Sequence, residues 1–193
     1  MRHITRLCVY CGSAPGHDER YRAAARELGA SLAQAGIELI FGGGRIGMMG
    51  VLADAVLTAG GRVVGIIPDR LRSREVAHQG ATELIVTGSM HDRKRLMAER
   101  ADAFAILPGG IGTLDETFEI LTWRQLGLHD KPIFLVDVAG YWQPLRALLD
   151  HLAAQEFTAS LVPRLLQIVP DIGALMRELA GTKPGRAPRP GLL

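Results

Sequence analysis

One stretch of the sequence decides the fold: residues 102–119, which read DAFAILPGGIGTLDETFE. Residues 103–107 are apolar without interruption, which favours a strand that is covered on both faces, as in a parallel sheet. Pro108 ends this strand, and three of the next four residues are glycine. Behind them apolar residues recur at helical spacing, and Thr113 suits the N-cap position, so the pattern predicts a helix that begins there.

The glycine-rich turn predicts a site for an anion. Glycine has no Cβ, so the main-chain N–H groups of Gly109, Gly110 and Gly112 can approach an anion closely. The start of the following helix adds unpaired N–H groups and the positive end of the helix dipole at the same place, so we expect a phosphate to bind there. Glu116 lies one turn into the helix. It either forms a capping box with Thr113 or takes part in catalysis, and this stretch alone leaves both interpretations open.

Length and composition are those of an ordinary globular protein. A chain of 193 residues with 48% hydrophobic and 22% charged residues suits one domain with a full core. The formal net charge is +2 and aromatic residues make up only 5%, so we expect no nucleic-acid partner. No apolar run approaches the length of about 20 residues that crosses a bilayer. The first residues show no signal-peptide pattern, so we expect a cytoplasmic protein without a membrane partner.

Strand and helix patterns alternate along the whole chain. Predicted strands cover residues 6–11, 38–41, 62–67, 83–86, 103–107, 133–136 and 167–169. Such alternation produces right-handed crossovers, a parallel sheet and helices on both faces. We therefore predict an α/β fold, a Rossmann-like three-layer αβα arrangement around a doubly wound parallel sheet of about seven strands. Residues 1–181 are expected to form this single nucleotide-binding domain, and residues 182–193 a disordered tail.

A second glycine-rich run follows the second predicted strand. Residues 42–47 read GGGRIG, which fits the dinucleotide-binding fingerprint. The run does not follow the first strand, however, and Asp69 is a poor match for the acid that binds the ribose. It is not a Walker A loop either, because Met48 stands where that loop needs a lysine. The run is either a tight structural turn or a second lining of the crevice at the carboxyl ends of the strands.

The helix that follows the fourth predicted strand carries two cations toward the interior. Met90, Met97 and Ala101 mark its inward stripe, Lys94 falls on that stripe, and Arg93 lies at its edge. Charged groups that face a core are costly unless they are paired or extend to solvent. Either both side chains reach solvent, or both face the crevice and contact an anion, arginine with bidentate geometry and lysine as a point charge.

Five further side chains have functional and structural interpretations. Cys8 and Cys11 have the spacing of a redox motif, but on a strand they point to opposite faces, and two cysteines alone do not make a zinc site. We interpret His91 and His129 as ordinary surface or helix-end residues, because nothing pairs them with a nucleophile. Ser13 is either a turn residue or a hydroxyl that lines the crevice.

These motifs together resemble the LONELY GUY (LOG) family, the cytokinin riboside 5′-monophosphate phosphoribohydrolases. The resemblance covers about Arg6 to Val169 and rests on residues 11–13 (CGS), 42–50 (GGGRIGMMG), 90–94 (MHDRK), 108–116 (PGGIGTLDE), 122–127 (TWRQLG) and 129–132 (HDKP). Members have often carried the label "lysine decarboxylase", which implies pyridoxal phosphate on a lysine. The three lysines, Lys94, Lys131 and Lys183, lie in no pattern that suggests a Schiff-base site.

The resemblance implies hydrolysis of the N-glycosidic bond of a nucleoside 5′-monophosphate, without a metal or an organic cofactor. N6-prenylated AMP is the implied substrate, ribose 5-phosphate and the free base are the products, and the implied assembly is a homodimer. Arg93 and Glu116 are the implied catalytic pair. With the crevice turns included, the expected substrate-binding residues are Gly12, Ser13, Gly43, Gly44, Gly47, Met49, Glu75, Lys94, Gly109, Gly110, Ile111, Gly112, Thr113, Leu114, Asp115 and Thr122.

The chemistry of these residue types agrees with that reaction. Cleavage at C1′ develops positive charge on the ribose, which a carboxylate such as Glu116 can stabilise while it orients or deprotonates water. A phosphate held by the glycine turn would fix the ribose against it. Glu75 either contacts the ribose hydroxyls or pairs with Arg72 or Arg74. Alternative functions are a general AMP nucleosidase, a non-catalytic nucleotide or cofactor carrier, and a dinucleotide-dependent oxidoreductase.

Overall fold

The computed structural model describes residues 3–72, 76–158 and 164–185 of the chain, and within them seven parallel strands form one sheet. The strand order is β4-β3-β2-β1-β5-β6-β7. The strands are β1 (Arg6–Tyr10), β2 (Glu38–Phe41), β3 (Val63–Pro68), β4 (Glu83–Thr87), β5 (Ala103–Ile106), β6 (Ile133–Val136) and β7 (Gln167–Val169). The predicted α/β fold with a doubly wound parallel sheet is confirmed.

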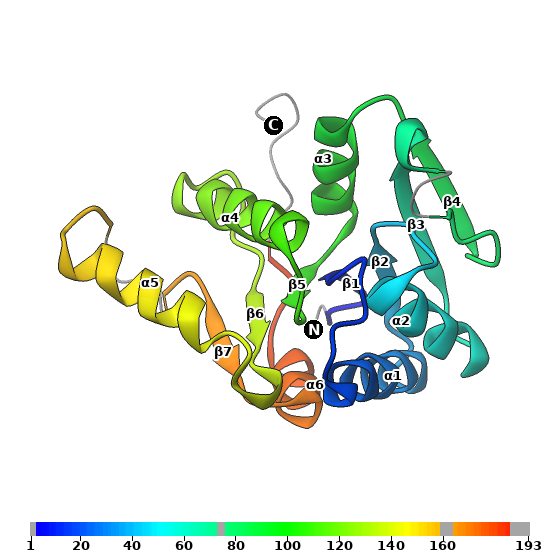
Figure 1. Ribbon diagram of the computed structural model, residues 1–193, viewed down its shortest axis with the longest axis horizontal. Coiled ribbons are helices and arrows are strands. Elements are labelled where there is room, and N and C mark those ends of the chain that lie inside the picture. The colour runs from blue at the N-terminus through cyan, green and yellow to red at the C-terminus, as the bar shows by residue number, and fades with distance from the viewer. Residues whose placement is uncertain (1–2, 73–75, 159–163, 186–193) are drawn as a thin grey trace.

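The helices cover both faces of this sheet. They are α1 (Glu19–Gln34), α2 (Gly47–Thr58), α3 (Met90–Arg100), α4 (Ile111–Gln125), α5 (Gln143–Ala154) and α6 (Ile172–Gly181), with short 3-10 turns η1 (Asp69–Leu71) and η2 (Val138–Gly140). α1, α2 and α6 pack into the core on one face, and α3, α4 and α5 into the core on the other. Figure 1 shows α1 and α6 below the sheet and α3 and α4 above it.

The central strands β1 and β5 are buried on both sides. All of residues 103–107 are fully buried, which explains why their sequence is apolar without alternation. In β1, side chains alternate between the two cores, and Cys8 and Cys11 lie in opposite cores as predicted. Both cysteines are free, and burial raises the pKa of both thiols. They are therefore packing residues rather than a redox pair.

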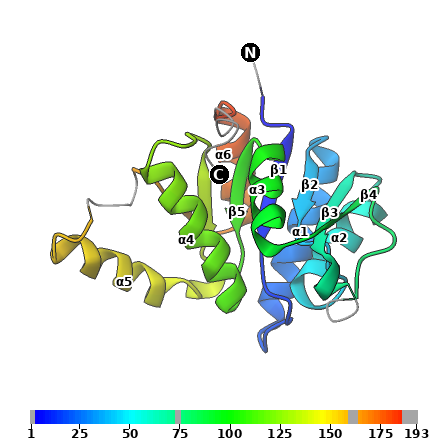
Figure 2. The same cartoon turned by 90° about the horizontal axis from the view of Figure 1, so that it is seen from above.

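The order of the strands reverses between β1 and β5. From β1 the chain moves outward to β2, β3 and β4, and α3 then returns it to β5 on the other side of β1. Figure 2 shows α3 and α4 on either side of β5, directly over this reversal. In doubly wound sheets a crevice opens at the carboxyl ends of the strands at such a point. Both glycine-rich turns follow strands that end there.

The start of α4 differs from the prediction. Thr113 is not the N-cap, because the helix begins at Ile111 and Gly110 is its extended N-cap, with φ −96° and ψ −153°. Thr113 therefore lies inside the first turn, and of the two interpretations left open for Glu116, the capping box with Thr113 is wrong. The main-chain oxygen of Thr113 instead accepts a hydrogen bond of 2.6 Å from the hydroxyl of Thr117.

Two side chains have environments opposite to those expected. Met90 is 38% exposed rather than inward, because it is the first residue of α3 and lies at the lip of the crevice. His129 is not a surface residue but is only 2% exposed, because it closes the connection between α4 and β6. Its Nε2 lies 3.0 Å from the oxygen of Ile120, and its Nδ1 accepts a 3.1 Å hydrogen bond from the N–H of Lys131.

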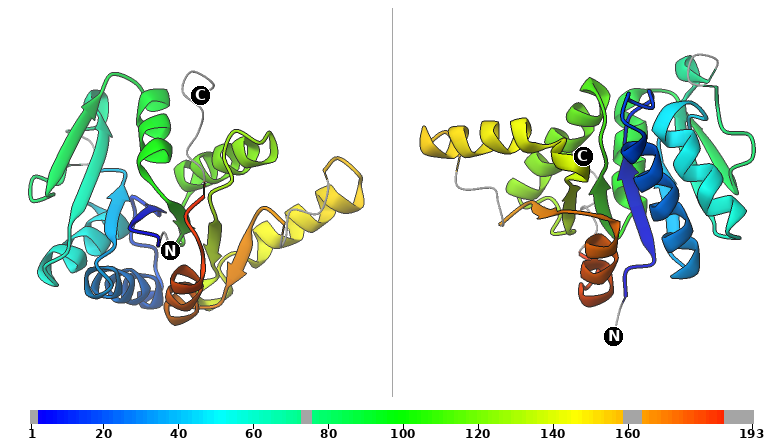
Figure 3. Two further views of the ribbon diagram at one scale, coloured as in Figure 1. Left: turned by 180° about the vertical axis from the view of Figure 1, so that it is seen from behind. Right: turned by 60° about the horizontal axis from the view of Figure 1, so that its bottom comes forward.

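The segment after α6 and the position of α5 complete the outline of the fold. Residues 182–185 follow α6 without regular structure, and the backbone of Gly185 lies against Lys131. Residues 186–193 lie outside the described part, so the disordered tail stays a prediction. Figure 3 shows α5 projecting outward from the body of the molecule in both views. Among the described residues, no helix combines the length and the apolar character that crossing a membrane requires.

Candidate active site

Three turns meet at the carboxyl ends of β1, β2 and β5. The N–H of Gly12 donates a 3.1 Å hydrogen bond to the oxygen of Pro108, and the oxygen of Gly12 accepts one of 3.0 Å from the N–H of Met48. Glycine is required where the turns touch. A Cβ on Gly47, whose φ is +62°, would collide with the carbonyl of Ser13. The sequence thus joins the two glycine-rich runs through the turn after β1.

These turns and the first residues of α3 and α4 enclose a cleft of about 140 Å³. Eight residues predicted to form the site line it: Ser13, Met49, Arg93, Gly110, Ile111, Gly112, Thr113 and Glu116. Four lining residues were missed as site residues: Val9, Cys11, Gly42 and Met90. Their signal was position, because Val9, Cys11 and Gly42 lie at or just beyond the carboxyl ends of β1 and β2, where the crevice was expected.

Arg93 is the buried cation of the cleft, with a side chain only 7% exposed. Its Nε donates to the oxygen of Ile66 and its Nη2 to the oxygen of Gly42, each over 3.1 Å. A Cβ at position 42 would overlap the guanidinium, so the glycine makes room for it. The third nitrogen, Nη1, lies 3.5 Å from Oε1 of Glu116. Two main-chain carbonyls therefore hold the arginine while Nη1 lies beside the carboxylate.

Glu116 is the buried carboxylate of the cleft, with a side chain 9% exposed. It lies on the second turn of α4, and Arg93 reaches it from α3, across the point where the strand order reverses. A buried carboxylate and a buried guanidinium that face one cavity can stabilise a developing cation and bind an anionic substrate together. The structure thus brings together the two residues that the sequence nominated as a catalytic pair.

The amide-rich end of the cleft is the first turn of α4. The first main-chain hydrogen bond of the helix runs from the N–H of Leu114 to the oxygen of Gly110 over 3.0 Å. N–H groups earlier in a helix have no partner within it and attract anions. Apart from the adjoining residues and the backbone of α4 itself, no atom of the described chain lies within 4 Å of the place where a Cβ would stand on Gly110 or Gly112. These two glycines therefore leave the approach to the turn open.

Lys94 does not line the cleft, although it was expected to bind substrate. Its side chain is 8% exposed, and its ammonium lies 3.1 Å from Oδ2 of Asp115 and 3.0 Å from Oε1 of Glu119. Burial by itself would lower the pKa of Lys94, but the hydrogen bonds to Glu119 and Asp115 outweigh it, so the pKa is raised above its usual value. Lys94 is thus a paired cation between α3 and α4.

The remaining predicted site residues lie around the cleft or away from it. Gly12 lines a neighbouring hollow of about 310 Å³ that shares Ser13 and Gly110 with the cleft. Thr122 is exposed two turns further along α4, and its hydroxyl donates to the oxygen of Phe118 over 2.7 Å. Glu75 lies outside the described residues. Leu114 borders an apolar groove, and the oxygen of Gly109 accepts a hydrogen bond from the hydroxyl of Tyr141. In the second glycine-rich run, the oxygen of Gly43 accepts a hydrogen bond from the main-chain N–H of His78, and Gly44 forms a β-bridge with Ala77.

Comparison with known proteins identifies the family. Residues 49–179 match the family model described as "Possible lysine decarboxylase". The chain belongs to this family. The protein named "Cytokinin riboside 5'-monophosphate phosphoribohydrolase LOG" from Oryza sativa subsp. japonica is 44% identical over 174 residues, which cover 90% of this chain and 72% of that protein. The resemblance to the LOG family is confirmed.

A second family member and a more distant fold relative complete the comparison. The "Cytokinin riboside 5'-monophosphate phosphoribohydrolase" of Rhodococcoides fascians is 47% identical over 152 residues, which cover 78% of this chain and 77% of that protein. Among solved structures, the Moco carrier protein from Chlamydomonas reinhardtii is 22% identical, with a TM-score of 0.69 over 94% of this chain and 99% of that chain. That likeness shows the fold alone.

Proposed function

We propose that this protein is a hydrolase of N-glycosyl bonds that cleaves nucleoside 5′-monophosphates, with N6-prenylated AMP preferred, to the free base and ribose 5-phosphate. One observation carries the proposal: Arg93 and Glu116 face the same 140 Å³ cleft, 3.5 Å apart, beside the open amide-rich end of α4. The names of the family members from rice and Rhodococcoides fascians support the same reaction.

The phosphate of the substrate docks at the first turn of α4 in this proposal. The open space at Gly110 and Gly112 supports that position, since a bound oxygen can approach their amides without meeting a side chain. The dipole of α4, which runs for 15 residues, favours negative charge at the same end. A phosphate fixed there holds the ribose in the cleft, so binding energy from the phosphate orients the reacting carbon.

Glu116 acts on the ribose in this proposal. As the C1′–N bond breaks, its electron pair leaves with the base and positive charge develops on C1′ and the ring oxygen. The carboxylate of Glu116 stabilises that charge and takes a proton from the attacking water, whose oxygen becomes the new hydroxyl at C1′. The base takes up one proton in exchange, so the products are uncharged at the broken bond.

Arg93 orients Glu116 and the substrate. Because Nε and Nη2 are held by the carbonyls of Ile66 and Gly42, the guanidinium has a fixed direction, and Nη1 remains beside the carboxylate and the cleft. A guanidinium in that position binds a phosphate or ribose oxygen with defined geometry. Lysine could not replace it, because a single ammonium does not reach two carbonyls and a carboxylate in one plane.

The described lysines do not suit the decarboxylation that the family description suggests. A Schiff base requires a neutral amine near the cleft. Lys94 is a charged ammonium bound by two carboxylates, and Lys131 lies at the opposite end of the sheet, where its ammonium donates 2.6 Å to the oxygen of Ala98. Lys183 lies on the exposed segment after α6. Pyridoxal phosphate therefore has no fitting attachment residue among them.

We further propose a homodimer that acts on free nucleotides, rather than nucleic acid, in the cytoplasm. The dimer is supported by an apolar groove of about 550 Å³ between α4 and α5. Ile111 is 82% exposed and lines both this groove and the cleft, and Leu148 on α5 is 48% exposed. Exposed apolar patches of this kind mark interfaces. Sedimentation equilibrium, which should give twice the chain mass, tests the dimer.

The decisive experiment is to measure base release from AMP and from N6-isopentenyl-AMP by chromatography. The proposal expects free base and an equal amount of ribose 5-phosphate from both, with a higher kcat/KM for the prenylated nucleotide. Equal kcat/KM values would instead indicate a general AMP nucleosidase. Binding of both nucleotides without any release of base would indicate a carrier and overturn the proposed function.

A further inference from the structure

Lys94 and two carboxylates of α4 form an ion-pair cluster beside the cleft, and no substrate role accounts for it. The ammonium of Lys94 contacts Asp115 at 3.1 Å and Glu119 at 3.0 Å. The side chain of Glu119 is 23% exposed and that of Lys94 only 8%, so this is a partly buried pair rather than a surface one. These two carboxylates take up two of the three N–H donors of the ammonium.

We propose that Glu119, acting through Lys94, is a positioning residue that fixes the rotation of α4 about its axis and so directs Glu116 into the cleft. This inference rests on the proposed function, since it concerns the group that would act on the ribose. It assigns Lys94 a different task from the substrate contact implied by family resemblance.

Helical geometry makes the cluster sensitive to rotation. Asp115 and Glu119 are four residues apart, so they lie on the same face of α4, one turn from each other. Glu116 follows Asp115 by one residue and is therefore rotated by about 100° around the axis. Lys94 contacts both members of the first face, and Arg93 contacts Glu116 on the next. Arg93 and Lys94, which are neighbours on α3, thus contact two different faces of α4. Contacts on two faces restrain the rotation of α4 about its axis.

The N-terminal part of α4 needs such an anchor. Ile111 is 82% exposed, and the positions of Gly110 and Gly112 have open space around them, so little packing restrains this side of the first turn. That openness suits a phosphate site, but it leaves the direction of the next turn to polar contacts. The buried stripe of α4, which holds Thr113, Thr117, Ile120 and Leu121, restrains the helix by packing. The two ion pairs to Lys94 add a polar restraint on the turn that carries Glu116.

The test compares Lys94→Met and Glu119→Gln with the wild type. Glu83→Gln is the matched control. It removes a different ion pair of α3, the one of 2.9 Å between Arg100 and Glu83 of β4, and leaves the contacts between α3 and α4 in place. Three quantities are measured: kcat and KM for AMP, the dissociation constant of ribose 5-phosphate by calorimetry, and hydrogen exchange of the α4 amides. The last two readouts do not depend on turnover.

A positioning role predicts that both variants lose kcat, by up to about 100-fold for Lys94→Met, because a misdirected catalytic group costs that much. The dissociation constant of ribose 5-phosphate should stay within about threefold, since the phosphate contacts are unchanged. Amides in the first turns of α4 should exchange faster in both variants and at the wild-type rate in Glu83→Gln.

The opposite pattern would overturn the inference. If Lys94→Met weakens ribose 5-phosphate binding by about tenfold or more, while Glu119→Gln keeps wild-type kcat and exchange, Lys94 is a substrate ligand. If the wild type releases no base, the proposed function fails, but exchange and binding still decide the role of Lys94. If neither variant changes the exchange of α4, the anchor does not exist.

Discussion

Two carboxylates stand at the two ends of β5, and their surroundings differ. Asp102 immediately precedes the strand at the amino end of the sheet, and Glu116 follows its glycine turn at the carboxyl end. Oδ2 of Asp102 accepts hydrogen bonds of 2.9 to 3.0 Å from Thr5 and Arg6, and its Oδ1 accepts one of 3.1 Å from Nη2 of Arg6. Glu116 instead lies 3.5 Å from its cation and faces a cleft.

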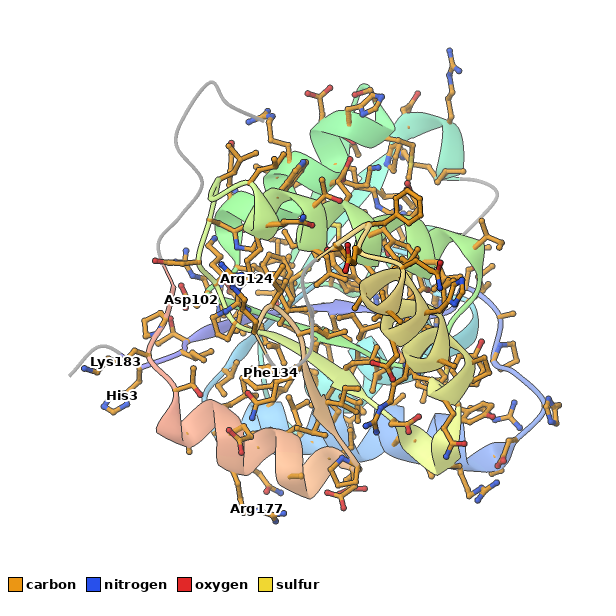
Figure 4. All side chains as sticks on the ribbon, turned by 90° about the vertical axis from the view of Figure 1, so that its left-hand side faces the viewer. His3, Asp102, Arg124, Phe134, Arg177 and Lys183 are labelled. Atoms are coloured by element: carbon orange, nitrogen blue, oxygen red, sulfur yellow. The ribbon has the colours of Figure 1, made fainter. Side chains whose placement is uncertain are left out.

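This difference in surroundings indicates that Asp102 stabilises the fold, whereas Glu116 can take part in a reaction. At Asp102 the oxygens accept from main-chain donors and a guanidinium at short range, so β1 and β5 are joined where both begin. Asp102 and His3 line a hollow of about 750 Å³ at this end of the molecule, where both are labelled in Figure 4. At Glu116 the ion pair is longer, at 3.5 Å, and the residue lines a cavity. Burial of charge alone therefore does not indicate a site.

Of the two carboxylates, Glu116 at the carboxyl end of β5 should show the largest effect on activity when it is replaced by an amide. Glu116→Gln keeps the size of the side chain but removes the charge and the basicity, so kcat for base release from AMP should fall by about 10²–10⁴-fold. The free energy of unfolding should change little, because the glutamine can still accept a hydrogen bond from Arg93. Turnover is measured by chromatography and stability by urea unfolding. Glu99→Gln, which alters a pair within α3, should keep wild-type turnover. Wild-type turnover in Glu116→Gln would remove the carboxylate from the reaction.

The same exchange at the amino end should affect stability instead. Asp102→Asn places an amide among the donors of Thr5 and Arg6, so the free energy of unfolding should fall by about 1.5–3 kcal/mol, the usual value for a hydrogen bond to a charged group. Burial would raise the pKa of Asp102, but the hydrogen bonds from Thr5 and Arg6 outweigh it and hold the pKa below its usual 3.8. The wild type should therefore lose its advantage only below about pH 4. A fall in kcat without a loss of stability would contradict the comparison.

The sequence predicted the site end better than the opposite end, for a physical reason. The apolar run 103–107, the glycine turn and Glu116 are local patterns, and local patterns report secondary structure and its ends. The contacts of Asp102 join residues 96 and 97 positions apart, and no local pattern reports them. The N-cap of α4 was misplaced by three residues, because Thr113 is a better N-cap by type than Gly110, and the open turn nevertheless favours the glycine.

Within the site, the residues could be predicted from the sequence, but their roles could not. Arg93 and Lys94 were both expected near an anion, yet the first turns to Glu116 and the second to Asp115 and Glu119. Adjacent residues on a helix point about 100° apart, so only the position of α4 decides which cation faces the cleft. The burial of Arg93 depends on carbonyls 27 and 51 residues away, and those distances follow from the sheet order rather than from the pattern of α3.

Alanine substitutions at Gly112 and Gly109 should separate an effect on substrate binding from an effect on stability within one turn. Gly112→Ala adds a methyl group in open space within a helix, so stability should hold or rise by up to about 1 kcal/mol. The methyl group would stand where the phosphate is proposed to approach, so KM for AMP should rise by about tenfold. Gly109→Ala should instead destabilise the fold, because its Cβ would overlap the side chain of Thr113. Steady-state kinetics and thermal unfolding separate the two effects. An unchanged KM in Gly112→Ala would place the phosphate elsewhere.

The smallest effect is expected at His129, a buried group of the fold whose charge the structure excludes. Its Nδ1 accepts from the N–H of Lys131, so the ring carries its proton on Nε2, which donates to the oxygen of Ile120. Both nitrogens are satisfied only while the ring is neutral, and burial lowers the pKa of His129 from 6.5 to about 4. Between these values the unfolded chain binds a proton that the folded chain does not, so stability falls as the pH falls.

The wild type should therefore lose about 1 kcal/mol of unfolding free energy between pH 7 and pH 5.5 through this residue. His129→Phe cannot titrate, so the difference in stability between the wild type and this variant should shrink over the same interval, while kcat measured at pH 7 stays close to that of the wild type. Urea unfolding at several pH values measures the difference. Parallel pH profiles would mean that the pKa of His129 is the same in the folded and the unfolded chain. Its Nδ1 would then have to face something other than the N–H of Lys131.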